Sequence, residues 1–175
     1  MLRVADAAKA TEIAINLLWC VPGKVGGSEQ YLTRQLAGLC GHSEFNLHAY
    51  VPQGFAVAHS ELADVVHLHE MPLTARNRGA RILYESTWLN SRTKNAQLVH
   101  HGGGTLPMRG NSNTLLTVHD VQYLTYPEYF SAVRLRYLKA MMPRSVKRAR
   151  TIAVPSAYVR GVLMEKFSLP GEKIH

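Results

Sequence analysis

The sequence predicts an α/β domain built on a doubly wound, mainly parallel sheet. Short apolar runs rich in β-branched residues alternate with segments that have helical periodicity. The apolar runs are nearly continuous, which is typical of parallel strands covered on both faces. With 175 residues, the chain is long enough for one such domain and too short for two ordinary ones.

Six apolar runs are the expected strands. They are Ile13–Trp19, Leu47–Val51, Val65–Leu68, Leu98–His101, Leu115–His119 and Thr151–Val154. Right-handed crossovers would bring the carboxyl ends of these strands to one edge of the sheet. Ile174 and His175 can begin a further extended segment. We therefore expect a domain cut from a longer protein, or a natural truncation.

Four apolar stripes with a period near 3.6 are the expected helices. The stripes run over Leu32–Cys40, Ala80–Thr87, Leu138–Ala149 and Val159–Phe167. Ser28 and Ser156 precede two of them and are suitable N-cap residues. Pro143 falls inside the third stripe and is expected to kink or restart that helix.

The composition is that of a folded domain in a reducing compartment. No apolar run reaches the roughly 18 residues needed to span a bilayer, and the extension 1–11 lacks the apolar centre of a signal peptide. Cys20 and Cys40 form no CxxC pattern, and we expect both to be reduced thiols. We predict a cytoplasmic protein.

The formal charge of +8 predicts an anionic partner, which can be nucleic acid, an anionic membrane or a phosphorylated ligand. Much of the charge lies in one stretch, formed by Arg134, Arg136, Lys139, Arg144, Lys147, Arg148 and Arg150. The stretch can also be a solvated helix face. Nucleic acid is the less favoured partner, because no stacking aromatics are interleaved with these residues.

A glycine-rich turn follows the first expected strand and opens the first helix. Gly26, Gly27 and Ser28 allow a tight turn and close approach of an anion such as a phosphate to backbone N–H groups. The turn matches neither the GxGxxG nor the GxxxxGK[ST] pattern. A turn without a ligand remains an alternative. Glu29 is expected to fix the loop rather than to do chemistry.

Polar residues follow two later strands at the edge where ligands bind in open α/β sheets. His119 is placed to donate a hydrogen bond to a bound polar group, and Asp120 can orient it or contact a hydroxyl. His101 and Tyr123 are expected to line a cleft, and we expect the turn at Gly26 to share its edge. Adjacent histidines of a strand point to opposite faces, so no metal site is predicted.

Several motifs occur in an order that is typical of one family. They are Gly26-Gly27-Ser28-Glu29 with Tyr31-Leu32 and Leu36-Ala37, Val118-His119-Asp120 with Tyr126-Pro127-Glu128, Ser145-Val146-Lys147-Arg148-Ala149, and Thr151-Ile152-Ala153-Val154-Pro155-Ser156. From about Glu12 to His175, the chain resembles the N-terminal domain of family-four retaining glycosyltransferases with the GT-B architecture. Pro155 departs from the commoner Ser or Thr of that family.

The resemblance implies a two-domain enzyme with its active site between two Rossmann-like halves. Residues 12–175 would form the acceptor-side domain, and the donor domain that holds most of the nucleotide-sugar is not in this chain. Gly26 and Gly27 would line the donor phosphates, His119 would contact the donor sugar with support from Asp120, and Ser156 would lie at the cleft. No cofactor or divalent metal is implied.

The expected function is hexose transfer from a nucleotide-sugar to a glycan or lipid-linked acceptor, with retention. The basic stretch would then help the protein sit on the inner face of an anionic membrane. A catalytically silent partner subunit and a nucleic-acid-binding module are the alternatives. A dehydrogenase is disfavoured by the missing GxGxxG pattern and the missing acidic residue about 20 positions later.

Overall fold

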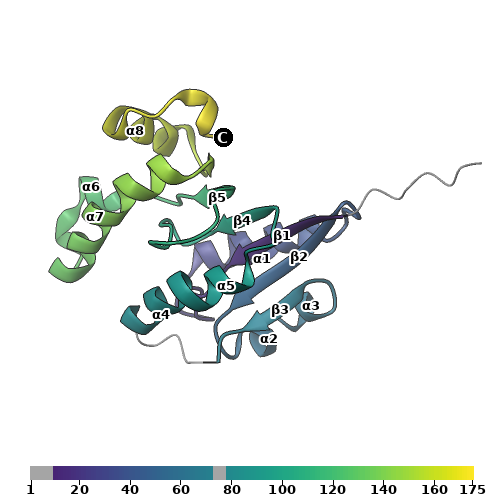
Figure 1. Ribbon diagram of the computed structural model, residues 1–175. Coiled ribbons are helices and arrows are strands. Elements are labelled where there is room, and N and C mark those ends of the chain that lie inside the picture. Colours follow the sequence, from purple (N-terminus) through teal and green to yellow (C-terminus); the bar gives the residue numbers. More distant parts are fainter. Residues whose placement is uncertain (1–9, 73–77) are drawn as a thin grey trace, which may run out of the picture.

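The computed structural model describes residues 10–72 and 78–175, and most of the predicted extension 1–11 lies outside these ranges. Six strands form one parallel sheet in the order β3-β2-β1-β4-β5-β6 (Figure 1). They are β1 (Thr11–Asn16), β2 (Phe45–Val51), β3 (His67–Glu70), β4 (Leu98–His101), β5 (Thr114–Thr117) and β6 (Thr151–Ala153). The order reverses direction between β1 and β4. The predicted fold class, a doubly wound parallel sheet, is confirmed.

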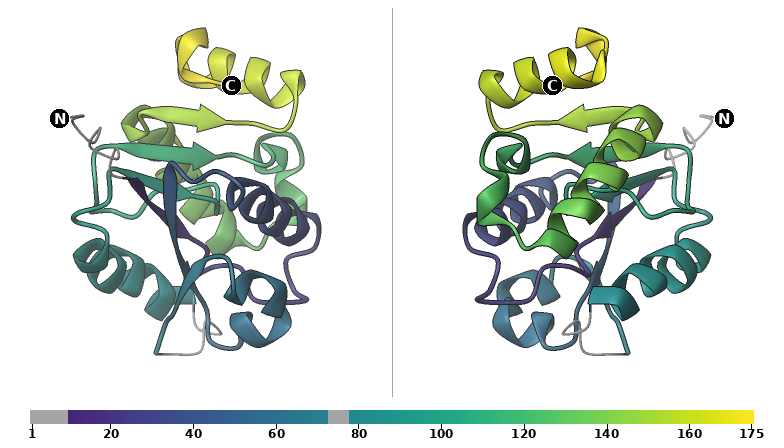
Figure 2. Two further views of the ribbon diagram at one scale, coloured as in Figure 1. Left: turned by 90° about the vertical axis from the view of Figure 1, so that its right-hand side faces the viewer. Right: turned by 90° about the vertical axis from the view of Figure 1, so that its left-hand side faces the viewer.

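Helices cover both faces of the sheet. The helices are α1 (Gly27–Leu39), α2 (Phe55–Ala58), α3 (Ser60–Ala63), α4 (Arg78–Tyr84), α5 (Asn90–Arg92), α6 (Gln122–Thr125), α7 (Ala132–Arg148) and α8 (Ala157–Phe167), with a π-helix η1 (Glu85–Leu89) and 3-10 turns η2 (Pro127–Tyr129) and η3 (Gly171–Lys173). In Figures 1 and 2, α4, α5 and α7 lie on one side of the sheet and α1 on the other. This arrangement follows from right-handed crossovers in a sheet whose winding reverses once.

Three buried clusters hold the layers together. One joins α1 to the strands through Leu32, Leu36 and Ile15. A second packs Leu89 against the opposite face of β1 and β2, and a third joins Val146 of α7 to β5 and β6. Because both faces of the sheet have an apolar cover, consecutive residues such as Ile13, Ala14 and Ile15 of β1 are all apolar and buried, as the sequence pattern indicated.

Several element boundaries differ from the sequence prediction. β1 ends at Asn16, and Leu17 begins a turn in which the Cys20 backbone N–H donates to the Leu17 carbonyl at 2.8 Å. β3 begins at His67, because Val66 still donates its N–H to Leu62 in the preceding turn. β5 likewise ends before His119, which lies in the loop that follows the strand.

The predicted helix caps have mixed outcomes. Ser156 caps α8, since its hydroxyl accepts from the Val159 N–H. Ser28 does not cap α1, because the helix starts one residue earlier and its N-cap is Gly26. Pro143 does not restart α7, which runs unbroken through it while Met142 and Val146 anchor the same stretch in the core.

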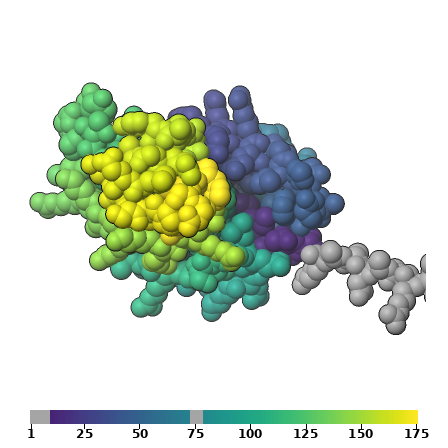
Figure 3. Space-filling model, turned by 90° about the horizontal axis from the view of Figure 1, so that it is seen from above, coloured from purple at the N-terminus to yellow at the C-terminus, as the bar shows by residue number. Residues whose placement is uncertain are grey.

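The last two residues extend the sheet beyond β6. Ile174 forms a parallel bridge with Ile152 and is 1% exposed, and the His175 N–H donates to the Ile152 carbonyl at 2.9 Å. The predicted extended segment is confirmed. Figure 3 shows the C-terminal residues, in yellow, as part of the continuous surface of the domain.

Two further predictions concern the cysteines and the membrane. Cys20 and Cys40 are both free thiols, and burial raises the pKa of Cys20 to about 12. Within residues 10–72 and 78–175, no helix combines the length and the apolar composition needed to cross a bilayer.

Candidate active-site cleft

A cavity of about 480 Å³ opens at the carboxyl edge of the sheet, beside the point where the strand order reverses. Open α/β sheets bind their ligands at this kind of crevice. The lining residues come from the loops after β1, β4 and β5, from the segment before α7, and from α1, α4, α6 and α7. They are Trp19, Lys24, Val25, Ser28, Arg81, Gly103, Gly104, Thr105, His119, Asp120, Tyr123, Phe130, Arg134, Tyr137 and Leu138.

The glycine turn places the start of α1 at the carboxyl edge of the sheet. Gly26 has φ 70° and ψ −134°, a conformation open almost only to glycine, and its carbonyl accepts from the Glu29 N–H at 3.0 Å. Gly27 and Ser28 therefore lie in the first turn of α1, where backbone N–H groups lack intrahelical acceptors. The predicted placement of the turn on the same edge as His119 is confirmed.

The Glu29 carboxylate fixes the conformation of the loop that carries the glycine turn. Its carboxylate accepts from the Gly23 N–H at 3.0 Å and from His59 Nε2 at 2.9 Å, and the residue is only 8% exposed. His59 in turn contacts Glu61 through Nδ1 at 3.3 Å. These contacts tie the loop after β1 to α2 and α3, as expected for a residue that fixes the loop.

Trp19 and the glycines after β4 form one wall of the cavity. A Cβ added at Gly103 would lie 2.7 Å from Trp19 Cδ1, so only glycine allows the indole to lie against this backbone. The Trp19 Nε1–H is buried and has no partner among the described residues. Trp19 thus brings an apolar ring to the cavity and carries an unused donor.

The geometry of His119 fixes its tautomer. Its Nε2 lies 2.9 Å from the Gly102 carbonyl oxygen, which can only accept, so Nε2 carries the proton. Burial lowers the pKa of His119, although the Gly102 contact and Asp120 oppose that shift. In the neutral ring Nδ1 is then an acceptor. For this tautomer the nitrogen left for a bound group is an acceptor, whereas the sequence analysis expected a donor.

Two aromatic rings hold the imidazole in place. The Tyr31 ring meets His119 edge-on at a centroid distance of 5.7 Å, and the Trp19 ring lies at 6.1 Å. Asp120 does not orient the ring by a direct hydrogen bond, since its Oδ1 accepts from the Gln122 N–H at 3.0 Å. The Gly102 carbonyl therefore orients the ring, which was one of the two roles that the sequence left open for Asp120.

Tyr123 lines the cavity, as predicted, and is 3% exposed. Burial raises the pKa of its phenol to about 12, so it stays protonated and can donate. Sequence reasoning missed Lys24, Arg81 and Tyr137, which reach the cavity from three separate segments. Arg81 and Tyr137 are single polar residues on helices, and Lys24 lies in the loop of the glycine turn but was not assigned to the site.

Comparisons with known proteins decide the family. The family model described as Glycosyltransferase Family 4 matches residues 25–175, which is most of the chain. The chain belongs to glycosyltransferase family 4. The crystal structure of a glycosyltransferase from Rickettsia africae ESF-5 is similar over 96% of this chain, with 17% identity and a TM-score of 0.49. The chain spans 42% of the length of that protein. No curated protein matches the sequence.

Two residues predicted to lie at the cleft of this family-four domain are not among those that line its cavity. His101 is 3% exposed, its Nδ1 contacts Asn16 Nδ2 at 3.1 Å, and burial lowers its pKa to about 3. The alternation of side chains turns it into the layer between the sheet and its helices. Ser156 is exposed, and its hydroxyl is used to cap α8.

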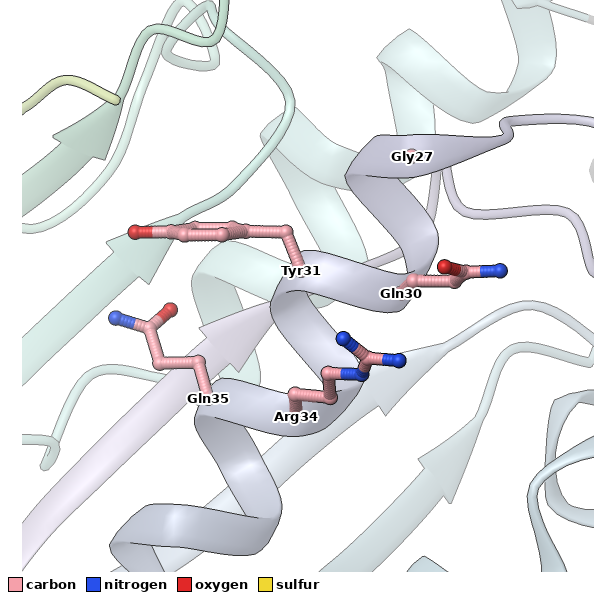
Figure 4. Close-up of a pocket in the computed structure, with 5 residues that line it drawn as sticks. All are labelled: Gly27, Gln30, Tyr31, Arg34 and Gln35. Atoms are coloured by element: carbon pink, nitrogen blue, oxygen red, sulfur yellow. The ribbon is translucent and has the colours of Figure 1, made fainter. Parts of the chain in front are cut away.

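A second hollow of about 440 Å³ lies on the outer side of α1 of the glycosyltransferase domain. Figure 4 shows its lining side chains spread along the exposed helix. They belong to Gly27, Gln30, Tyr31, Arg34 and Gln35. The hollow borders the cleft, because Tyr31 also contacts His119.

Metal ligands are not assembled in the described part of this family-four domain. No group of three or more His, Cys, Asp or Glu side chains could hold an ion there. Next to His101, His100 is also buried, and its Nε2 lies 2.8 Å from Thr117 Oγ1. The cavity lining itself offers cations, hydroxyls, an imidazole and the Asp120 carboxylate.

Proposed function

We propose that this domain is the acceptor-side half of a nucleotide-sugar-dependent hexosyltransferase that acts with retention on a glycan or lipid-linked acceptor. The observation that carries the proposal is the cavity at the switch point, which joins the start of α1 to His119 in a family-four domain. Hexose transfer and retention are taken over from the family resemblance.

The glycine turn is proposed to face the donor diphosphate. Gly26 and Gly27 leave room for close approach, since no heavy atom lies within 4 Å of a Cβ added at either position. The first-turn N–H groups and the Ser28 hydroxyl would then donate to phosphate oxygens, with Lys24 adding charge. Protein groups would carry the phosphate charge, and the proposal includes neither a metal nor a cofactor.

His119 is proposed to hold a hydroxyl of the donor sugar through Nδ1. When the bond from the anomeric carbon to the phosphate oxygen breaks, its electron pair leaves with the phosphate and positive charge grows on the sugar. The acceptor oxygen then bonds to the anomeric carbon, and its proton leaves with the phosphate. A neutral imidazole, favoured by the lowered pKa of His119, adds no opposing positive charge beside that centre.

The proposal includes partners outside this chain. A donor domain, in the same protein or in a partner, would form the second wall of the cleft, and transfer by this chain alone is not expected. The basic residues of α7 would favour an anionic membrane on the cytoplasmic side. A silent partner subunit would share the fold but would not need the neutral His119.

The test is a titration of the ¹⁵N-labelled chain with UDP-glucose and with GDP-mannose, in which NMR monitors the amide chemical shifts. We expect weak binding, near millimolar and about −4 kcal/mol, with amide shifts concentrated in residues 23–28 and at His119. His119→Gln should weaken the shifts, whereas His42→Gln, an exposed histidine before β2, should not. Shifts spread over other surfaces would contradict the proposed donor-phosphate site at the glycine turn. Robust sugar transfer by the chain alone would contradict the proposed need for a donor domain.

A further inference from the structure

The cleft holds more positive charge than the donor contacts of the proposed function use. Lys24, Arg81 and Arg134 line the cavity, and Asp120 is the carboxylate among its lining residues. Trp19, Phe130 and Leu138 add apolar walls beside these charges. Charge beside low-dielectric walls attracts anions more strongly than the same charge on an open surface.

Two of the three cations approach from the sheet face opposite to the glycine turn. Arg81 is on α4 and Arg134 on α7, and both helices lie on the other side of the sheet from α1 (Figures 1 and 2). Lys24 belongs to the same loop as the glycine turn. The cavity thus has a donor-side cation and, across it, a pair of arginines.

Contacts within the described part of the chain hold both arginines at the cavity wall. The Arg134 guanidinium lies over the Phe130 ring at 4.9 Å, which orients it without using its N–H groups. Arg81 Nε is buried without a hydrogen-bond partner among the described residues, and lies 3.6 Å from Glu85 Oε1. Glu85 is itself buried behind it, so part of the Arg81 charge is balanced from the protein side.

Hydroxyl groups lie along the same cavity. Thr105 Oγ1 and the Tyr137 hydroxyl are 3.1 Å apart, and the Tyr123 phenol lines the same cavity. Such groups suit the hydroxyls of a sugar or polyol, and guanidinium forks suit phosphate or carboxylate. The hydroxyls and the guanidinium groups of the cavity therefore suit a small molecule that carries both hydroxyl groups and an anionic group.

We propose that the acceptor of this enzyme is a sugar or polyol that bears an anionic group, phosphate or carboxylate, held by Arg81 and Arg134. This inference rests on the proposed function and names the acceptor class for the same cleft. The donor diphosphate is placed at the glycine turn, and the acceptor anion lies across the cavity from it.

The test compares glucose 6-phosphate, glucuronate and glucose as ligands of the chain, with UDP-glucose titrated in parallel. One of the two anionic sugars should bind at least about tenfold more tightly than glucose, which is about 1.4 kcal/mol, and the comparison between them separates phosphate from carboxylate. Equal binding of all three sugars would overturn the inference.

Three variants locate the anion. Arg134→Gln should weaken the anionic sugar about tenfold and leave UDP-glucose unchanged, because Arg134 lies across the cavity from the glycine turn. Arg134 is exposed on α7, so the substitution should not disturb the fold. Arg136→Gln makes the same charge change two residues away, outside the cavity lining, and should have less than about a twofold effect. Arg81→Lys keeps the positive charge opposite Glu85 but removes the guanidinium group that can donate two parallel hydrogen bonds. This variant should also bind the anionic sugar more weakly.

The outcomes separate this inference from the proposed function. If Arg134→Gln weakens UDP-glucose as much as the anionic sugar, the anion belongs to the donor and the inference fails. If UDP-glucose shifts no amide in residues 23–28 while the anionic sugar still requires Arg134, the anion site stands and the proposed donor function fails.

Discussion

Two adjacent glycines at the start of α1 should respond to alanine in opposite directions. Gly26 has φ 70° and ψ −134°, and a Cβ there meets no heavy atom within 4 Å. The cost of Gly26→Ala is therefore conformational alone, about 1–3 kcal/mol. Gly27 also has open space around its Cβ position but is the first helical residue, without a positive φ. Gly27→Ala should be neutral or stabilise by up to about 1 kcal/mol.

The assay is urea unfolding of both variants and the parent chain, followed by circular dichroism. For a domain of this size each kcal/mol corresponds to roughly 2–4 °C in Tm, so thermal melts give a second readout. The slope of the unfolding free energy against urea should stay constant, because neither change alters the buried surface. Equal stability of the two variants would refute the conformation assigned to the turn.

Three further predictions concern the site and the charges. In a protein that joins this domain to its donor domain, His119→Ala should lower kcat roughly 100-fold. Burial lowers the pKa of His100 to about 4 and of His101 to about 3. Unfolded histidine titrates near 6.5, so unfolding takes up protons and the free energy of unfolding should fall steadily as pH drops from about 6.5 to about 3. Binding of the chain to anionic vesicles through residues 134–150 should weaken steeply with salt and be absent on neutral vesicles.

Each of these predictions has a contradicting result. A stable His119→Ala protein with kcat within a few-fold of the parent would remove that residue from the chemistry. Unfolding free energy that does not change between pH 6.5 and 4, measured by urea titration, would mean that the two histidines are not buried as neutral rings. Equal affinity for neutral and anionic vesicles in a co-sedimentation assay would exclude an electrostatic membrane contact, and tight duplex DNA binding without vesicle binding would favour a nucleic-acid partner.

The sheet was predictable because both of its faces are covered. Runs such as Leu47–Val51 and Thr151–Val154 therefore stay apolar at nearly every position and stand out in the sequence. The edge strand β3 was displaced by two residues in the prediction. Its sequence, HLHE, is polar because one side of an edge strand is partly exposed, whereas the apolar Val65 and Val66 belong to the preceding turn.

The candidate site was only partly predictable. His119 and the turn at Gly26 lie in the connections that leave β5 and β1, so the strand pattern alone indicated that both are at the carboxyl edge. Arg81 and Arg134 reach the cavity from helices, and which side of a helix meets a cavity depends on tertiary packing. The free nitrogen of His119 depends on its contact with the Gly102 carbonyl, which no local pattern indicates.

The most direct test of the central claim is the ¹⁵N chemical shift of the two His119 ring nitrogens during titration with UDP-glucose and, separately, with UDP. We expect Nε2 to carry the proton in the free chain and to stay bonded to the Gly102 carbonyl. UDP-glucose should move the Nδ1 resonance toward that of a hydrogen-bonded acceptor, and UDP without the sugar should leave it unchanged. An Nδ1 resonance that does not respond to UDP-glucose at saturation, or that responds equally to UDP, would contradict the claim that His119 holds the donor sugar.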